Sequence, residues 1–205
     1  MKLSWLHNRG SLMQKTGLAF ADQIILSGGN FLISILIIKG LDKADYGLYA
    51  LAIALQMFLI SLQNAIVTTP LAISFASLPP QDRPLYIGSL FAGQNRGLLV
   101  AALLTAVVLI AGAAFQVDGL KLLFAACFVF AAAGMVTKEF LRAVFFTQET
   151  PQQVLKVDVL QLLLYLAFIF VSVFADHFSL SLLLLFAGFS SFLAFFIVAT
   201  FRQWR

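Results

Sequence analysis

Charged residues are scarce in this chain: they make up 11% of its 205 residues, against about 25% in soluble domains. Hydrophobic residues reach 61%, and 22 residues are Phe. The chain therefore lacks the polar residues that cover a water-soluble globule, which argues against a cytosolic enzyme, a secreted disulfide domain and a nucleic-acid-binding module. The composition predicts an integral membrane protein.

Cysteine and histidine are also scarce. Cys127 is the only cysteine and lies within an apolar run, so no intrachain disulfide is expected. The two histidines, His7 and His177, are far apart in the sequence, so we expect no metal site. Because no nucleophile is accompanied by a base and an acid, we expect neither an enzyme nor a bound cofactor.

Long apolar runs are what the chain has in abundance. A bilayer core about 30 Å thick is spanned by about 20 apolar residues in a helix, and six runs are long enough. Because these runs are continuous and do not alternate with polar residues, they predict helices and not barrel strands. We expect a single all-α domain over residues 1–205, a polytopic membrane protein with six transmembrane helices. The predicted spans are residues 17–38, 46–67, 97–115, 122–142, 157–175 and 178–201.

The predicted connections alternate in length. Residues 40–45, 116–121 and 176–177 are short and predict helical hairpins, whereas residues 68–96 and 138–156 are longer. Within the first long connection, residues 85–96 are polar on one face and predict either an interfacial helix or an extension of the third span. The long connections hold the five prolines, which are Pro70, Pro79, Pro80, Pro84 and Pro151.

The basic residues predict the orientation of the chain. With the N-terminus inside, ten Lys and Arg lie in inner segments and three lie in outer loops, so the positive-inside rule places both termini in the cytoplasm. The first run is too long for a signal peptide and contains Asp22 and Asn30, so we expect it to be retained. The inner residues are Lys2, Arg9, Lys15, Arg83, Arg96, Lys138, Arg142, Lys156, Arg202 and Arg205; the outer ones are Lys39, Lys43 and Lys121.

Polar residues recur along one face of the first predicted helix. Gln23, Ser27, Asn30 and Ser34 follow one another at spacings of 4, 3 and 4, which places them on one stripe of a 3.6-residue helix. The stripe has two explanations: close helix packing with interhelical hydrogen bonds of about 0.6 kcal/mol each, or the wall of a hydrated cavity. Asp22, beside the stripe, faces water or a cation if it lies deep in the membrane, and is simply wet if it lies near the interface.

Two other predicted helices carry weaker stripes. Tyr49, Gln56 and Gln63 recur at intervals of seven, and Asp158 and Gln161 begin a stripe that continues to Tyr165 and Ser172. Three polar stripes are more than a bundle needs for packing, although interhelical hydrogen bonding stays an alternative. The predicted substrate or ion pathway comprises Asp22, Gln23, Ser27, Asn30, Gln56, Gln63, Asp158 and Gln161.

Charged residues cluster at the inner boundary between the fourth and fifth predicted helices. For Lys138 and Lys156 we expect snorkelling toward the lipid headgroups. The planar fork of Arg142 suits a carboxylate or a phosphate. The simpler expectation is an ion pair from Arg142 to Glu139 or Asp158, and the alternative is a phosphate contact.

Two segments of the chain carry a resemblance to a known family. The first runs from Ala21-Asp22-Gln23 through Ser27-Gly28-Gly29-Asn30-Phe31 and on to Ala50, with Asp45-Tyr46-Gly47-Leu48-Tyr49 in the predicted first outer loop. The second is Lys138-Glu139-Phe140-Leu141-Arg142, followed by Phe145-Phe146 and Asp158. On these residues, about a third of the chain, the sequence resembles the N-terminal half of Wzx-like polysaccharide (oligosaccharide) flippases, in the multidrug/oligosaccharidyl-lipid/polysaccharide exporter superfamily.

The resemblance implies one six-helix lobe of a two-lobe transporter in a bacterial inner membrane. Such a transporter moves a lipid-linked glycan to the outer leaflet by alternating access, around a cleft between repeated halves. The pathway residues would then meet sugar hydroxyls or a coupling cation, and Arg142 and Arg96 would contact the diphosphate. The implied partners are the lipid-linked glycan, membrane lipid and a second half-transporter or a second copy, with no nucleic acid.

The chain departs from the family where a second lobe would begin, because it stops at Arg205. The expectation is therefore a truncated or split transporter, with a homodimer as the alternative. Two alternatives stay open: a non-transporting scaffold or subunit of a glycan-assembly complex, and a half of a multidrug exporter.

Overall fold

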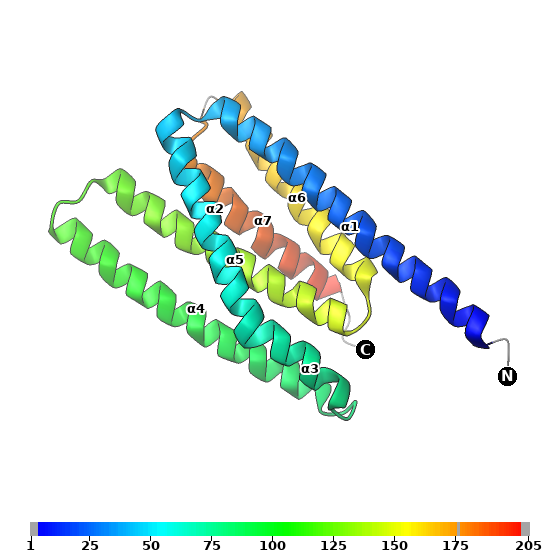
Figure 1. The fold of residues 1–205 in the computed structure, drawn as a ribbon. Helices are drawn as coiled ribbons and strands as arrows, with labels where there is room; N and C mark the ends of the chain where they lie inside the picture. The colour runs from blue at the N-terminus through cyan, green and yellow to red at the C-terminus, as the bar shows by residue number, and fades with distance from the viewer. Residues whose placement is uncertain (1–3, 176, 202–205) are drawn as a thin grey trace.

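The protein is an all-helical membrane bundle (Figure 1). The computed structural model describes residues 4–175 and 177–201; Lys2, Asp176, Arg202 and Arg205, which enter the predictions above, lie outside this part. Within the described residues, six helical segments are long and apolar enough to cross a membrane, which confirms the predicted fold class. The elements are α1 (Ser4–Gly40), α2 (Lys43–Gln63), the π-helix η1 (Asn64–Thr68), α3 (Thr69–Ser77), α4 (Arg83–Ala114), α5 (Gly119–Thr147), α6 (Pro151–Phe174) and α7 (Leu180–Phe201).

Both long predicted connections are mostly helical, so their predicted bounds are wrong. The second spanning segment continues through η1 and α3 to Ser77, and α4 begins at Arg83, so residues 85–96 extend the third span. The prolines misled the prediction: Pro70, Pro84 and Pro151 lie in the first turn of α3, α4 and α6. Proline is tolerated there because the first-turn N–H groups have no intrahelical acceptor.

The predicted first outer loop is also shorter than expected. The Asp42 carboxylate accepts a hydrogen bond from the Asp45 N–H at 2.8 Å and caps α2, which begins at Lys43. Tyr46 and Gly47, predicted in this loop, therefore lie in the first turns of α2. Asp118 caps α5 in the same way, by accepting from the Leu120 N–H at 3.0 Å.

Helix α5 lies at the centre of the bundle and crosses α7 closely (Figure 1). Gly134 and Gly188 meet at this crossing, where a Cβ atom added to Gly134 would lie 2.8 Å from the Gly188 carbonyl oxygen. Small residues let helix backbones approach in a membrane, where packing and not the hydrophobic effect drives association. The α5–α7 pair contacts α6 and α2, and α1 packs on α6.

We expect Gly134→Ala to destabilise the protein by about 1–3 kcal/mol, because the added methyl group meets backbone atoms that cannot move aside. The free energy of unfolding in mixed detergent micelles measures the loss. Gly93→Ala is the matched control: its Cβ would meet nothing within 4 Å, and alanine favours a helix over glycine. Equal stability of the two variants would contradict the close α5–α7 crossing.

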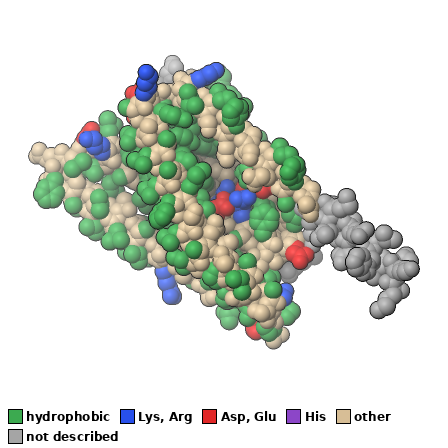
Figure 2. All heavy atoms as spheres, in the orientation of Figure 1, with side chains coloured by type: hydrophobic (Ala, Val, Ile, Leu, Met, Phe, Trp, Pro, Cys, Tyr) green, Lys and Arg blue, Asp and Glu red, His purple; other side chains and the backbone are tan. Residues whose placement is uncertain are grey.

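Helices α1 and α2 diverge from their short connection, α1 along α6 and α2 across α5 (Figure 1). Figure 2 shows a hollow on this face in which acidic and basic side chains gather, with hydrophobic side chains around them. The fold thus places charged groups from three helices within the spanning part of the bundle.

Candidate functional site

Five charged side chains meet where α1, α5 and α6 approach one another. We call this set the charge network; its members are Asp22 of α1, Lys138, Glu139 and Arg142 of α5, and Asp158 of α6. Asp22 and Asp158 are buried, with 2% and 0% of their surface exposed. All five lie in segments that qualify as membrane spans, where charged side chains are costly and normally pair with one another.

The guanidinium of Arg142 holds the three acidic residues together. Its Nη1 lies 2.9 Å from Glu139 Oε2, its Nη2 lies 3.3 Å from Asp22 Oδ2, and its Nε lies 2.7 Å from Asp158 Oδ2. The Asp158 contact is an ion pair whose alignment is poor for a hydrogen bond. The sequence predicted an ion pair from Arg142 to Glu139 or to Asp158; both pairs are present, and Asp22 adds a third from a distant part of the chain.

Lys138 does not snorkel to the headgroups, so that expectation is wrong. Only 3% of its surface is exposed, and its ammonium lies 3.2 Å from Asp158 Oδ1, 3.0 Å from Gln161 Oε1 and 3.3 Å from Glu139 Oε1. Three acceptors match the three donors of an ammonium group. Lys138 lies on the face of α5 that turns toward α6, where it neutralises the fully buried Asp158.

The charge network carries an excess of negative charge. With all groups ionised, three carboxylates against two cations leave a formal charge of −1. Asp22 Oδ1 and Asp158 Oδ2 also lack a hydrogen-bond donor among the described residues. In a medium of low dielectric constant, such a site attracts a cation and repels an anion.

The negative charge of the network bears on the phosphate contacts predicted for Arg142 and Arg96. Each nitrogen of the Arg142 guanidinium faces a carboxylate, so a phosphate has to displace one of them. Arg96 is exposed on α4 and is not a member of the charge network. Phosphate binding by these two residues stays a prediction.

A cavity of about 430 Å³ adjoins the charge network; ten of its 17 lining residues are apolar and seven are polar or aromatic, and we call it the polar-walled cavity after these seven. Gln161 connects the two, because it lines the cavity and accepts a hydrogen bond from Lys138. Gln56 is 3% exposed, and its Nε2 has no hydrogen-bond partner among the described residues, an arrangement that is rare unless a ligand or solvent accepts the bond. The polar and aromatic lining residues are Asn30, Ser34, Tyr46, Tyr49, Gln56, Gln161 and Tyr165.

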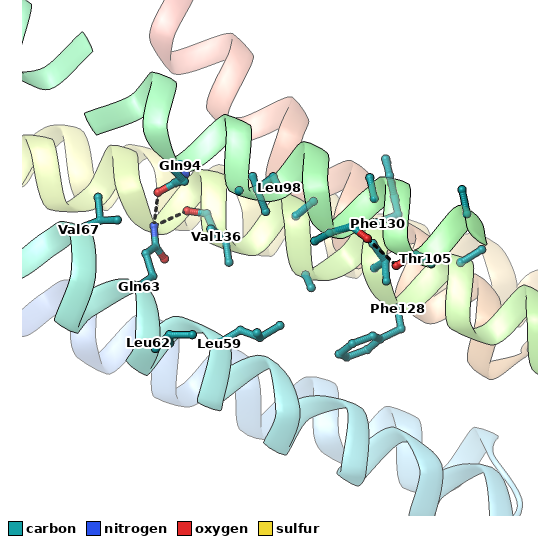
Figure 3. Close-up of a pocket in the computed structure, with 18 of the residues that line it drawn as sticks. Leu59, Leu62, Gln63, Val67, Gln94, Leu98, Thr105, Phe128, Phe130 and Val136 are labelled. Atoms are coloured by element: carbon teal, nitrogen blue, oxygen red, sulfur yellow. Dashed lines mark hydrogen bonds between the residues drawn. The ribbon is translucent and has the colours of Figure 1, made fainter. Parts of the chain in front are cut away.

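The remaining predicted pathway residues lie outside this cavity. Gln23 and Ser27 are exposed on α1. Gln63 instead ties three helices together, because its Nε2 donates to Gln94 Oε1 of α4 and to the Val136 carbonyl oxygen of α5, both at 2.8 Å (Figure 3). Gln94 was not predicted as a site residue, because residues 85–96 were expected to form either an interfacial helix or an extension of the third span. A polar side chain within a helical stretch was the signal that could have identified it.

The described residues contain no group of three or more His, Cys, Asp or Glu side chains placed to hold a metal ion. Comparisons of the chain with protein-family models, with curated proteins and with solved structures found no match.

Proposed function

We propose that the chain is one lobe of a membrane transporter, and that the hollow between α1 and α2 is one wall of its pathway. The observation that carries the proposal is the charge network beside the polar-walled cavity, within membrane-spanning helices. Buried ion pairs are poor stabilisers, because apolar residues of similar size often serve as well or better. Charged groups inside a membrane protein more often mark a path for ions or substrate.

The proposed substrate is a lipid-linked glycan, moved between leaflets with a cation as the coupling ion. The amide and phenol groups of the cavity provide donors and acceptors for sugar hydroxyls. The negative charge network suits a coupling cation more than the diphosphate of the substrate. The resemblance to Wzx-like flippases supports this choice of substrate, and the proposed site is a bacterial inner membrane.

A non-transporting scaffold is the second candidate. It is favoured by the pairing of the charges within the lobe, since Arg142 and Lys138 are surrounded by acceptors of the same chain. In that case the network would serve packing alone.

A leaflet-translocation assay in native membranes separates the two candidates. We expect Asp22→Asn and Asn30→Ala to reduce translocation by about ten-fold or more, because each removes a polar contact worth about 1.4 kcal/mol or more to a bound ion or substrate. Leu32→Ala is the control, because Leu32 is exposed on the opposite face of α1. Full activity of both variants at normal membrane levels would leave the scaffold as the better assignment.

A further inference from the structure

A second cavity lies on the other side of α2, between α2, α4 and α5 (Figure 3). It has a volume of about 590 Å³, and we call it the α2–α4 groove. Its walls are large aliphatic side chains, among them Leu59, Leu62 and Leu98, and small residues such as Gly97 and Ala101 leave the space between them. The Gln63–Gln94 hydrogen bond joins α2 to α4 here, and beyond it the two helices diverge (Figure 1).

The lining of the groove favours an apolar occupant. Gln63, Gln94 and Thr105 are its polar side chains. The Gln63 amide nitrogen and the Thr105 hydroxyl donate within the protein, whereas Gln63 Oε1 and Gln94 Nε2 have no hydrogen-bond partner among the described residues and almost no exposed surface. Bound water needs two to four polar partners, and apart from these two atoms the described side chains of the lining supply none. No charged side chain is among the described lining residues, so an ionic group finds no counter-charge.

The groove is too small to enclose a helix of another protein or of a second copy. One turn of helix, about 10 Å wide and 5.4 Å long, occupies about 420 Å³. The groove therefore holds little more than one turn, far less than a membrane-spanning segment. A single flexible hydrocarbon chain fits this elongated, apolar space.

We propose that the α2–α4 groove binds one acyl chain of a membrane phospholipid as a fixed part of the lobe. The lining residues belong to segments that qualify as membrane spans, so the surrounding medium is hydrocarbon. An empty groove would forfeit the dispersion contacts of its lining. The bound acyl chain fills the space that side chains leave open where α2 diverges from α4. The position of α2 therefore depends on the acyl chain. This inference is independent of the transport activity proposed above.

Two glycines of α4 provide a matched pair of variants. A Cβ atom at Gly97 or at Gly93 would meet nothing within 4 Å, but Gly97 lines the groove and Gly93 does not. Phenylalanine at position 97 therefore occupies the space of the chain, whereas phenylalanine at position 93 enters the bilayer. Both replacements remove a helical glycine, so their effects on the backbone are alike.

The experiment measures phospholipid retained by the full chain in native mass spectrometry, with phosphatidylcholine or phosphatidylglycerol added to the detergent. We expect the unmodified protein and Gly93→Phe to retain one phospholipid and to melt at a higher temperature when it is added. Gly97→Phe should show neither effect. The amount of phospholipid retained should be equal for the two headgroups, because the groove recognises the acyl chain. Retention of phosphatidylglycerol alone, or equal retention by Gly97→Phe, would overturn the proposal.

A second measurement needs no substitution and so does not depend on the folding of a variant. Phosphatidylcholine with a diazirine on its acyl chain is photolysed with the unmodified protein, and the labelled residues are mapped by peptide mass spectrometry. Labelling concentrated on the groove residues of α2 and α4 supports the proposal. Labelling spread evenly over the exposed face of α4 contradicts it. In the native mass spectrometry experiment, a dimer of the unmodified protein that disappears in Gly97→Phe also contradicts it.

Discussion

Arg142→Ala is expected to destabilise the protein by about 3–5 kcal/mol, the usual cost of removing one partner from a buried ion pair. The substitution leaves Asp22, Glu139 and Asp158 with Lys138 as their one cation in the network, so its formal charge falls from −1 to −2. Asp158 is fully buried, so water cannot compensate for the lost partner. Reversible unfolding in mixed micelles measures the change.

The control for this prediction is Arg96→Ala. Arg96 is exposed on α4, and a surface substitution changes stability by no more than about 0.5 kcal/mol. Adding Glu139→Gln to Arg142→Ala should restore part of the lost stability, because it removes one of the uncompensated carboxylates. Equal stability of Arg142→Ala and Arg96→Ala would show that the network does not form.

The double variant Arg142→Ala/Glu139→Gln distinguishes the transporter from the non-transporting scaffold. If the charge network only holds helices together, Arg142→Ala/Glu139→Gln should recover stability and biological activity in parallel. If it binds a coupling cation, recovered stability should leave translocation low, because the arrangement of charges along the pathway has changed. Comparing the stability and the activity of this double variant therefore separates a packing role of the charge network from a transport role.

The number of spans was predictable because the bilayer imposes it. Every backbone polar group in hydrocarbon must be paired, so a long apolar run has to be a helix. The ends of the helices were less predictable, since Pro70 and Pro84 look like helix breakers in the sequence but start the next helical turn. A capping residue such as Asp42 was the better signal of a boundary.

The site was predictable in part, because periodicity gives the face of a helix but not its neighbours. Gln56 and Gln63 are seven residues apart and share a face of α2, yet they lie about 10 Å apart along the axis. Gln56 borders the polar-walled cavity, whereas Gln63 donates a hydrogen bond to Gln94. The burial of Lys138 was missed for the same reason: only the packing of α6 on α5 shows that it faces Asp158.

If the hollow between α1 and α2 is hydrated, as the proposed function requires, thiol reactivity should differ greatly between two faces of α1. In a Cys127→Ala background, we expect Asn30→Cys to react with a water-soluble maleimide more than about ten-fold faster than Leu32→Cys. The reason is that the reacting species is the thiolate, which forms readily in water and poorly in an apolar environment. Asn30 lines the polar-walled cavity, whereas Leu32 is 48% exposed on the opposite face.

The two positions differ by about 3 Å in depth, so a difference in rate reports the face of the helix and not its distance from the interface. Denatured samples of both variants should react equally, which controls for the intrinsic reactivity of each thiol. A lipid-linked substrate that enters the hollow should then slow the reaction at position 30. Equal rates in the folded protein would mean that acyl chains fill the hollow, and a polar pathway between α1 and α2 would be untenable.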